Sequence, residues 1–516
     1  MCGDGRAPWE ELQAMSTADY NTPIPSGLLT PDLIEIRGTS LHLADGFLDQ
    51  VDVADAFALG DVSRAANLFM SLVPVASLEA IRTGYEEVFS EGGPAETNWM
   101  IFDDLMDSNS LFLTGNTDTV YAFCMLDLAK SGPVVIDVPA NCGPSTINDA
   151  MFSFVIDMGP PGPDRGAGGK YLILGPDYSG PLSETVNGEV AEHDGETYFV
   201  AHSPTYVNWV PCRGMLVDGE TAPASSLFRN GIRAYALRDK DNPPPMTWKN
   251  MSGVEVNTIH SNDASFFEEV HRAIDREPPD AFDPEILGMA SLLGIRKGEP
   301  FEPSERQREV LEQGVALGNA YARAVSFAPR APEAYLYGEE NGKWYTMLYG
   351  NDYRYLIDDG VGGVDAEARL AFYYVATVNT PAMILKMPGV GSQYAMIARD
   401  SDGAWLEGDR TYTLRLPPDV PVKNFWSLVA YDAQTRSMLQ TPDQPFPSVN
   451  SMRPDLTTEP DGSVNLHFSA ERPAENSGNW IQLRPGKSWF AIIRLYGPLE
   501  PWFDKTWRPG ELNVLD

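Results

Sequence analysis

Cysteine and histidine are scarce in this chain, and their spacing does not suit metal or redox sites. The four cysteines, Cys2, Cys124, Cys142 and Cys212, lie far apart and form no C-x-x-C pair. The six histidines have neither H-E-x-x-H nor H-x-H spacing. We therefore expect reduced, structural thiols and no metal site built from histidine and cysteine, although carboxylates could still hold a hard cation.

Positive charge is also in short supply. The chain has 37 Lys+Arg against 73 Asp+Glu, a net charge of −36. Such a balance repels phosphate backbones and anionic lipid heads, so we expect neither nucleic acid nor a membrane surface as a partner. A small-molecule substrate is the expected partner, and a homo-oligomer is left open.

Long hydrophobic runs are missing. No segment approaches the roughly 20 consecutive apolar residues of a membrane-spanning helix, because even residues 62–81 are interrupted by Arg64, Asn67 and Pro74. The first residues, MCGDGRAPWEELQAM, include acidic side chains and lead into no apolar run of signal-peptide length. As written, the chain is expected in the cytoplasm, and a periplasmic or secreted location is expected only if a leader was trimmed.

Common cofactor and nucleophile motifs are absent as well. The sequence contains no G-x-x-x-x-G-K-[ST] and no G-x-S-x-G. Its glycine-rich stretch 159–171 leads into a strand-like segment rather than a helix, so we expect a hairpin loop and not a phosphate cradle. The sequence therefore indicates no cofactor.

What the chain does contain is two β-type segments separated by helical spacing. Residues 110–240 and 389–516 carry short β-branched and aromatic runs between turn residues. Residues 44–109 and 262–388 have apolar residues at helical spacing, and Ser304 with Gln307 fits a capping box. Residues 1–43 are expected to be a surface arm. The pattern predicts a β-rich α+β fold in which two antiparallel β domains of the sandwich or barrel kind are joined by a helical middle region.

The most suggestive polar segment runs from Asn116 to Tyr121, directly before the first strong strand. Asn116, Asp118 and Tyr121 can project to one face of an extended segment. A carboxylate and a phenol that meet beside a cavity can share proton transfer, so these three residues are the predicted catalytic group, with Asp118 as the base and Tyr121 as the acid or oxyanion donor. The alternative is an Asx-type turn in which Asp118 binds local backbone and Tyr121 packs.

Candidate substrate-binding residues lie in both β segments. Arg213, close after Trp209, and Arg494, inside an apolar strand, can each hold an anion through a bidentate fork, or each can be a buried arginine paired with a carboxylate. Asp149 could add a carboxylate to the first site, although turns have the same composition. Trp426 and its neighbouring tryptophans could stack on a sugar or a hydrophobic ligand, or could pack in a core.

These segments resemble a known pair of domains. The run from Asn116 to Tyr121, with LDLAKSGPVVIDVPA and SPTYVNWVPCRGMLVDG, resembles the bacterial domain of unknown function 1254. The runs DSDGAWLEGDRTYTLRLPPDVPVKNFWSLVAYD and GNWIQLRPGKSWFAIIRLYGPLEPWFDKTWRPGEL resemble its usual companion, domain of unknown function 1214. The resemblance implies two jelly-roll-like domains with helices between them and no settled activity. One departure is Leu439–Ser451, where Pro445 and Phe446 replace an expected Arg and Tyr.

Two functions follow from these residues. The first is a cofactor-independent enzyme that acts on a small organic molecule by general acid-base chemistry, as a hydrolase or a lyase. The second is a non-catalytic protein that binds carbohydrate or another protein through an aromatic groove. A jelly roll can host either function. Convergence of Asp118, Tyr121 and Arg213 on one closed pocket would favour the enzyme, and an exposed aromatic groove would favour the binder.

Overall fold

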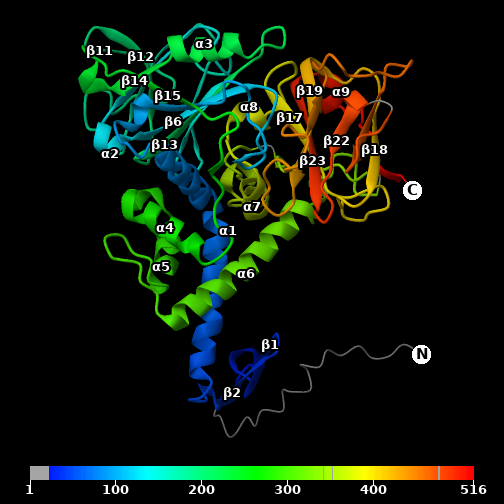
Figure 1. Cartoon of the computed structure of the whole chain (residues 1–516). Helices are drawn as coiled ribbons and strands as arrows, with labels where there is room; N and C mark the ends of the chain where they lie inside the picture. The colour runs from blue at the N-terminus through cyan, green and yellow to red at the C-terminus, as the bar shows by residue number, and fades with distance from the viewer. Residues whose placement is uncertain (1–21, 341, 351, 475–476, 516) are drawn as a thin grey trace.

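In this computed structural model, residues 22–340, 342–350, 352–474 and 477–515 are described. Two β domains lie next to each other at the top of Figure 1, with helices beneath them, and the long helix α1 (Val53–Val88) runs down and away from both. The predicted β-rich α+β class is confirmed.

The first β domain is built from two sheets that share an apolar core. One sheet has the order β15-β4-β6-β13-β8-β9, and its strands are Thr247–Asn250, Asn98–Ile101, Val120–Asp127, Val207–Gly214, Ser145–Asp149 and Phe154–Met158. The other has the order β11-β12-β10-β7-β14, and its strands are Val190–His193, Glu196–His202, Gly169–Leu174, Val134–Val138 and Arg233–Ala236. Ile136 and Ile147 pack in one buried cluster, which joins the two sheets.

The glycine-rich stretch does not form the expected hairpin loop. Strands β9 and β10 belong to different sheets, so residues 159–168 carry the chain from one sheet to the other. Asp164 holds this crossing by accepting hydrogen bonds from the Gly159 amide (2.8 Å), the Gly168 amide (3.0 Å) and the Tyr171 hydroxyl (2.6 Å). The hairpin prediction was wrong because strand pattern alone does not say which sheet a strand joins.

The C-terminal β domain is also made of two sheets. The first, in the order β17-β23-β19-β20, contains Ser392–Ile397, Trp489–Pro498, Val422–Asp432 and Ser448–Asn450. The second, in the order β22-β21-β18-β24, contains Trp480–Gln482, Val464–Ser469, Thr411–Leu416 and Leu512–Leu515. Every pair is antiparallel except β21 with β22. Trp426, Trp489 and Trp502 are buried in the core between these sheets.

The helical region packs on α1. Its helices are α4 (Ser265–Arg276), α5 (Pro284–Leu292), α6 (Glu305–Phe327), α7 (Ala366–Val375) and α8 (Pro381–Ile384). Shorter elements are α2 (Leu128–Ser131), α3 (Ala222–Gly231), α9 (Glu500–Phe503) and the pair β5 (Ser110–Leu111) and β16 (Val256–Asn257). The capping box predicted at Ser304 and Gln307 is confirmed at the start of α6. None of the described helices has the length and apolar composition needed to cross a bilayer.

Part of the expected surface arm has regular structure. Strands β1 (Leu33–Ile36), β2 (Thr39–Ala44) and β3 (Phe47–Leu48) form a small antiparallel sheet, drawn beside the far end of α1 in Figure 1. Arg37 and Gly38, with φ of 44° and 93°, make the two-residue turn between β1 and β2. Residues 1–21 of the arm, including Cys2, lie outside the described residues.

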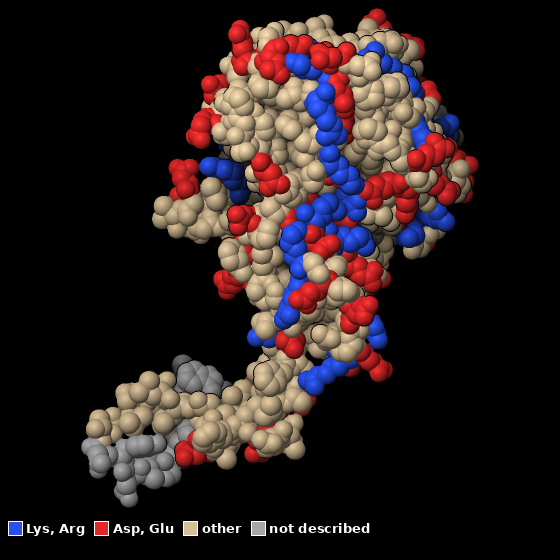
Figure 2. Space-filling view, turned by 90° about the vertical axis from the view of Figure 1, so that its left-hand side faces the viewer, with Lys and Arg blue, Asp and Glu red and all other residues tan. Residues whose placement is uncertain are grey.

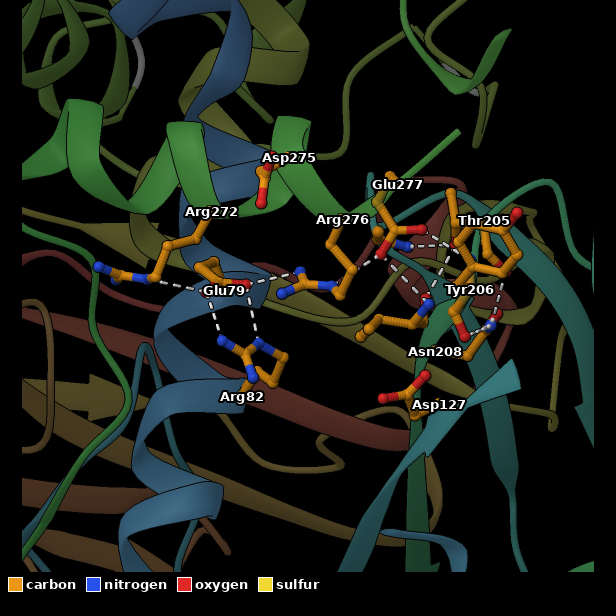
Figure 3. A network of polar contacts seen from close by, with 12 residues as sticks. Glu79, Arg82, Asp127, Thr205, Tyr206, Asn208, Arg272, Asp275, Arg276 and Glu277 are labelled. Carbon is orange, nitrogen blue, oxygen red and sulfur yellow. Dashed lines mark hydrogen bonds and ion pairs between the residues drawn. The ribbon is translucent and has the colours of Figure 1, made fainter. Parts of the chain in front are cut away.

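A polar network connects α1 to α4 and to the start of β13 (Figure 3). Glu79 on α1 is buried and accepts hydrogen bonds from Arg82, Arg272 and Arg276. Burial alone raises the pKa of Glu79, but Arg82 and Arg276 outweigh it and lower that pKa to about 2. Arg276 also pairs with Glu277, which accepts from the amides of residues 206 and 207 at 2.6 and 3.2 Å. The helices thereby fix the strand that carries Arg213.

Charge is unevenly distributed over the surface despite the large net negative charge. On the face seen in Figure 2, lysine and arginine side chains gather in a band that runs from the β domain at the top down to the helices below. Acidic side chains flank this band on both sides. Many of its charges are therefore balanced locally by neighbours of opposite sign.

Candidate functional site

A cavity of about 100 Å³ lies between the two β domains, next to α7. Strands β6 and β13 border it on one side and β17 and β23 on the other, with residues 346–348 and 376–378 completing the wall. Most of the wall is apolar and comes from Met106, Phe112, Phe123, Trp209, Phe372, Met383, Met396 and Ile492. An apolar cavity with a few polar groups is typical of a small-molecule site.

Arg213 is the least constrained cation of this cavity. It stands opposite Tyr121 in the β13–β6 pairing, and its guanidinium carbon lies 5.7 Å from the Tyr121 ring centroid and 5.8 Å from that of Tyr496. Its Nη1 donates a hydrogen bond to Ser392 Oγ at 3.3 Å. The Tyr394 hydroxyl is a further hydrogen-bond partner of its guanidinium. No described carboxylate forms an ion pair with Arg213, so its charge is open to an anionic ligand.

Arg494 also lines the cavity, but its guanidinium makes more hydrogen bonds to the protein than that of Arg213. Its Nη2 donates to the Tyr431 hydroxyl at 2.7 Å, to the Gly115 carbonyl at 3.3 Å and to the Thr114 carbonyl. Its Nε has no partner among the described residues. Arg494 therefore joins β23 of the second domain to the 114–115 loop of the first.

The two arginines act together on Tyr394 of β17. Tyr394 stands opposite Arg494 in the β17–β23 pairing, and the Arg494 guanidinium carbon lies 5.4 Å from its ring centroid. Burial alone raises the pKa of the Tyr394 phenol, but the charges of Arg213 and Arg494 outweigh burial and lower that pKa below its ordinary value. Tyr394 is thus a phenol in the cavity wall that gives up its proton more readily than a free tyrosine.

Asn116 organises the other two phenols of the site. Its Nδ2 donates to the Tyr121 hydroxyl at 2.9 Å and to the Tyr496 hydroxyl at 2.8 Å. Because each phenol oxygen accepts from the amide, its own proton stays free to donate elsewhere. Tyr121 lines the cavity, so its hydroxyl can serve as a hydrogen-bond donor there.

Asp118 lies behind this cavity and does not form part of its wall. Its Oδ1 accepts from Asn450 Nδ2 at 2.9 Å and from Thr117 Oγ1 at 3.2 Å, and its amide donates to Asn116 Oδ1 at 2.8 Å. Burial raises the pKa of the Asp118 carboxyl. The Asx turn weighed from the sequence does occur, with Asn116 rather than Asp118 as the accepting side chain.

Two residues of the cavity wall have unusual backbone conformations. Thr114 and Val378 are β-branched, and their φ angles are 43° and 67°. This left-handed region disfavours β-branched side chains, and such outliers concentrate at functional sites.

The remaining predicted residues are dispersed. Trp209 lines the cavity, whereas Asp149 and Trp426 do not. Asp149 Oδ1 accepts from the Met151 and Ser153 amides, both at 2.8 Å, so it fixes the β8–β9 turn, and burial raises its pKa to about 7. Trp426 packs in the C-terminal core. The structure thus brings together Asn116, Tyr121, Trp209, Arg213 and Arg494.

A smaller cavity of about 60 Å³ adjoins the first one, and Tyr121 and Arg213 line both. Asp157 lies in its wall, nearly buried, and its Oδ1 has no partner among the described residues. Burial raises the pKa of Asp157 to about 6, against hydrogen bonds from Thr146 and Thr380 that lower it. Arg213 therefore lies between two adjoining, mostly apolar cavities, the smaller of which also contains the Asp157 carboxyl.

The segment Leu439–Ser451, which departs from the family pattern, lies at the junction of the two domains. Gln440 Nε2 donates to the Ser108 carbonyl at 2.9 Å, and the Ser108 amide donates to the Pro445 carbonyl at 2.9 Å. Ser448 Oγ lies 2.7 Å from Thr117 Oγ1. The segment packs against residues 108–118 and does not line the cavity.

Metal-binding groups do not gather in the part of the chain that the structure describes. No three His, Cys, Asp or Glu side chains lie close enough there to hold an ion. Cys124, Cys142 and Cys212 are buried free thiols.

Sequence reasoning missed Tyr394, whereas Asp157, like Asp149, could be considered from the sequence as a further carboxylate of the first site or as a turn residue. Tyr394 lies in SQYAMIARD, a segment with the pattern of a strand. The feature that marks it as a candidate site residue is its position opposite Arg494 in the sheet. That register comes from the pairing of two segments about 100 residues apart, which a single sequence does not specify.

Comparison with solved structures concerns the fold. The VPA0106 protein of Vibrio parahaemolyticus is 17% identical, matches 88% of this chain and 100% of that chain, and has a TM-score of 0.51. A putative uncharacterized protein from Burkholderia cenocepacia is 12% identical, matches 90% of this chain and 97% of that chain, and has a TM-score of 0.35. Among curated proteins, none matches the chain.

The family comparison agrees with the sequence resemblance. Residues 98–236 match the family described as protein of unknown function (DUF1254), and residues 391–500 match the family described as protein of unknown function (DUF1214). The first match covers β4 to β14 and the second covers β17 to the start of α9, so the two domains contribute opposite walls of the cavity. The chain therefore contains a match to the DUF1254 family followed by a match to the DUF1214 family, in the order expected from the resemblance.

Proposed function

We propose that this protein is an enzyme that acts on a small, largely apolar organic anion by general acid-base chemistry, with Tyr394 as the proton-transfer group. The observation that carries the proposal is the Tyr394 phenol, which lies near the buried Arg494 and the partly buried Arg213 in the wall of an apolar cavity. A base works best when its pKa is shifted toward the working pH, and the arginines shift Tyr394 in that direction.

The other cavity residues have complementary roles in this proposal. Arg213 binds the anionic group of the substrate, because no described carboxylate competes for it. Tyr121, oriented by Asn116, donates a hydrogen bond to the oxygen on which negative charge develops. The apolar wall strengthens both interactions by excluding water. Two jelly-roll-like domains, each supplying one wall, are the architecture that we propose for the site.

Both predicted reaction classes fit this arrangement. In a lyase, the Tyr394 phenolate removes a proton from a carbon beside the substrate's carbonyl or carboxyl group, and a leaving group departs with the electron pair. In a hydrolase, the phenolate removes a proton from water, and the resulting hydroxide attacks the carbonyl carbon of an ester. The acyl C–O bond then breaks, and the departing alkoxide takes up the proton held by Tyr394. The tryptophans invoked for the binding alternative are buried in the core and offer no support for an aromatic groove.

Proton abstraction can be tested without knowing the natural substrate. Oxo acids with apolar side chains are incubated with the protein in D₂O, and deuterium uptake at carbon is followed by NMR. Tyr394→Phe is expected to lower the protein-dependent uptake on the order of 10²-fold, because only the phenol oxygen is lost. Release of acid from small esters of the same side chains tests the hydrolase in parallel.

Tyr337→Phe is the matched control, because the Tyr337 hydroxyl is buried without a hydrogen-bond partner among the described residues and lies outside the cavity. It should keep full exchange. If Tyr394→Phe also keeps full exchange, or if no compound is exchanged or hydrolysed by the wild-type protein, the proposal fails and the binding function takes its place.

The earlier prediction that Asp118 is the base stays a prediction, and one variant separates it from Tyr394. If Asp118 is the base, Asp118→Asn should cost as much activity as Tyr394→Phe. If the Asp118 carboxylate instead only holds Asn450 and Thr117 in place, we expect the activity of the folded protein to persist and the free energy of unfolding to fall by about 1 kcal/mol. Turnover and a urea denaturation curve on the same sample distinguish the two roles.

A further inference from the structure

A third, larger cavity lies among the helices and shares no lining residue with the two cavities around Arg213. Its volume is about 430 Å³. Helix α1 forms one wall, residues 281–286 at the start of α5 a second, and the turn between β8 and β9 a third. Helix α7 and residues 353–355 complete it. A volume of this order is typical of sites for small organic ligands.

Arg369 of α7 faces this cavity without a counter-ion. Its guanidinium makes no ion pair and no hydrogen bond with any described residue, whereas its backbone amide donates to the Asp365 carbonyl at 3.1 Å. Burial lowers its pKa, and only the phenols of Tyr373 and Tyr355 act in the opposite direction. The chain carries 73 acidic residues, so the lack of a described carboxylate beside this guanidinium is not explained by a shortage of them.

Two further polar groups in the wall also lack partners. The Tyr355 hydroxyl is buried and has no hydrogen-bond partner among the described residues. Oδ1 of Asn379 is also buried and has no hydrogen-bond partner among the described residues, whereas its Nδ2 donates to the Tyr353 carbonyl at 2.5 Å. Buried polar groups are normally satisfied, so these two unsatisfied groups, together with the unpaired and partly buried guanidinium of Arg369, indicate a missing polar occupant.

The other charged residues of the wall are already engaged. Arg354 forms a two-armed contact with Asp352, with its Nη2 at 2.8 Å from the carboxylate. Asp283 is exposed, and its carboxylate caps α5 by accepting a hydrogen bond from the Glu285 amide at 2.8 Å. Apolar side chains from Leu72, Val75 and Ile286 cover much of the remaining wall.

We propose that this cavity is a second ligand site, which binds a small organic carboxylate through Arg369 and the Tyr355 hydroxyl. A carboxylate accepts hydrogen bonds from a guanidinium and a phenol at once, and an apolar body fits against α1 and α5. Oδ1 of Asn379 adds a preference for ligands that carry a hydroxyl or amino donor. The site does not depend on the function proposed for the cavity between the β domains.

Benzoate is the probe, with benzamide as its neutral counterpart of similar shape. Calorimetric titrations are done on Arg213→Met, which removes the cationic anchor of the first site. We expect this protein to bind benzoate at one site and to bind benzamide at least tenfold more weakly. Adding Arg369→Met should weaken benzoate binding by tenfold or more, and adding Tyr355→Phe by a smaller factor, because hydrogen bonds to a charged group are lost.

Arg330→Met is the matched control, since Arg330 contacts Glu367 on the outer side of the same helix and does not line the cavity. Arg369→Lys keeps the charge and serves if Arg369→Met does not fold. Unchanged benzoate affinity in Arg369→Met and Tyr355→Phe would overturn the proposal. Equal affinity for benzamide and benzoate, or no binding of either compound, would overturn it as well.

Discussion

At the scale of single residues, the environment of each charged group decides its role. Arg213 and Arg494 were open to two interpretations from sequence, an anion anchor or an arginine paired with a carboxylate. No described carboxylate pairs with either, so the second interpretation fails among the described residues. The sequence was enough to select these arginines as candidates, because burying an arginine in an apolar strand costs free energy unless its charge is paired or hydrogen-bonded. It could not find Tyr394, whose chemistry comes from neighbours on other strands.

The Asp149 carboxyl gives a pH-dependent prediction. Burial raises its pKa from 3.8 to about 7, against hydrogen bonds from Ser153 and Met151, so the folded protein keeps a proton that the unfolded chain has already lost. Between these values the folded state binds the extra proton, and the free energy of unfolding falls as pH rises by about 1.4 kcal/mol per unit. Asp149→Asn removes this dependence.

From pH 5 to pH 7, Asp149→Asn should therefore gain on the order of 2 kcal/mol of stability relative to wild type. Urea denaturation at both pH values measures this difference. Asp280→Asn, at an exposed position in a neighbouring segment, is the control and should show the same difference from wild type at both pH values. Parallel pH profiles for wild type and Asp149→Asn would contradict the assignment.

At the scale of elements, local signals were enough for helices and strands but not for their partners. The capping box at Ser304 and the apolar spacing of α1 and α6 are local, and both helices are present. The 159–168 crossing was misassigned, because its strands look alike whichever sheet they join. The β1–β2 hairpin was missed because its strands are short and partly exposed, so they have little apolar alternation.

The packing of α1 against α4 depends on the charge of Glu79. Glu79→Gln keeps the size of the side chain but leaves Arg82, Arg272 and Arg276 without their shared carboxylate. Unmatched, partly buried charges are costly, and the partial exposure of these arginines reduces that cost, so we expect a loss of about 2 kcal/mol in the free energy of unfolding at pH 7. Chemical denaturation measures it.

Glu86→Gln provides the comparison, because Glu86 also pairs with Arg82 but is 55% exposed. An exposed pair of this kind contributes less than about 1 kcal/mol. The Glu79 pKa lies below its ordinary value, so the contribution of Glu79 is complete above pH 4.5 and is lost as the pH falls toward 2. Equal losses from both variants would mean that burial of Glu79 does not matter.

At the scale of the whole molecule, the candidate site exists only because the two β domains meet. Asn116 and Tyr496 are 380 positions apart in the chain, yet a hydrogen bond joins them. The Asp118–Asn450 contact crosses the same junction. Sequence patterns could predict two β domains and place candidate residues in each, but the contact between domains depends on the packing of both with α7. The convergence of Arg213 and Arg494 therefore could not be predicted.

Arg494 is the residue through which this junction can be tested. Arg494→Met removes the donor shared by the Thr114 and Gly115 carbonyls and the Tyr431 hydroxyl, and it leaves these buried acceptors without that partner. We expect a loss of about 2 kcal/mol in the free energy of unfolding, together with faster hydrogen exchange of peptides that span residues 107–118 and 436–450. Arg415→Met, at an exposed position on β18 in the same domain, should leave exchange in both peptides unchanged. If Arg494→Met lowers stability but accelerates exchange only within the C-terminal sheets, Arg494 supports its own domain and does not hold the two domains together.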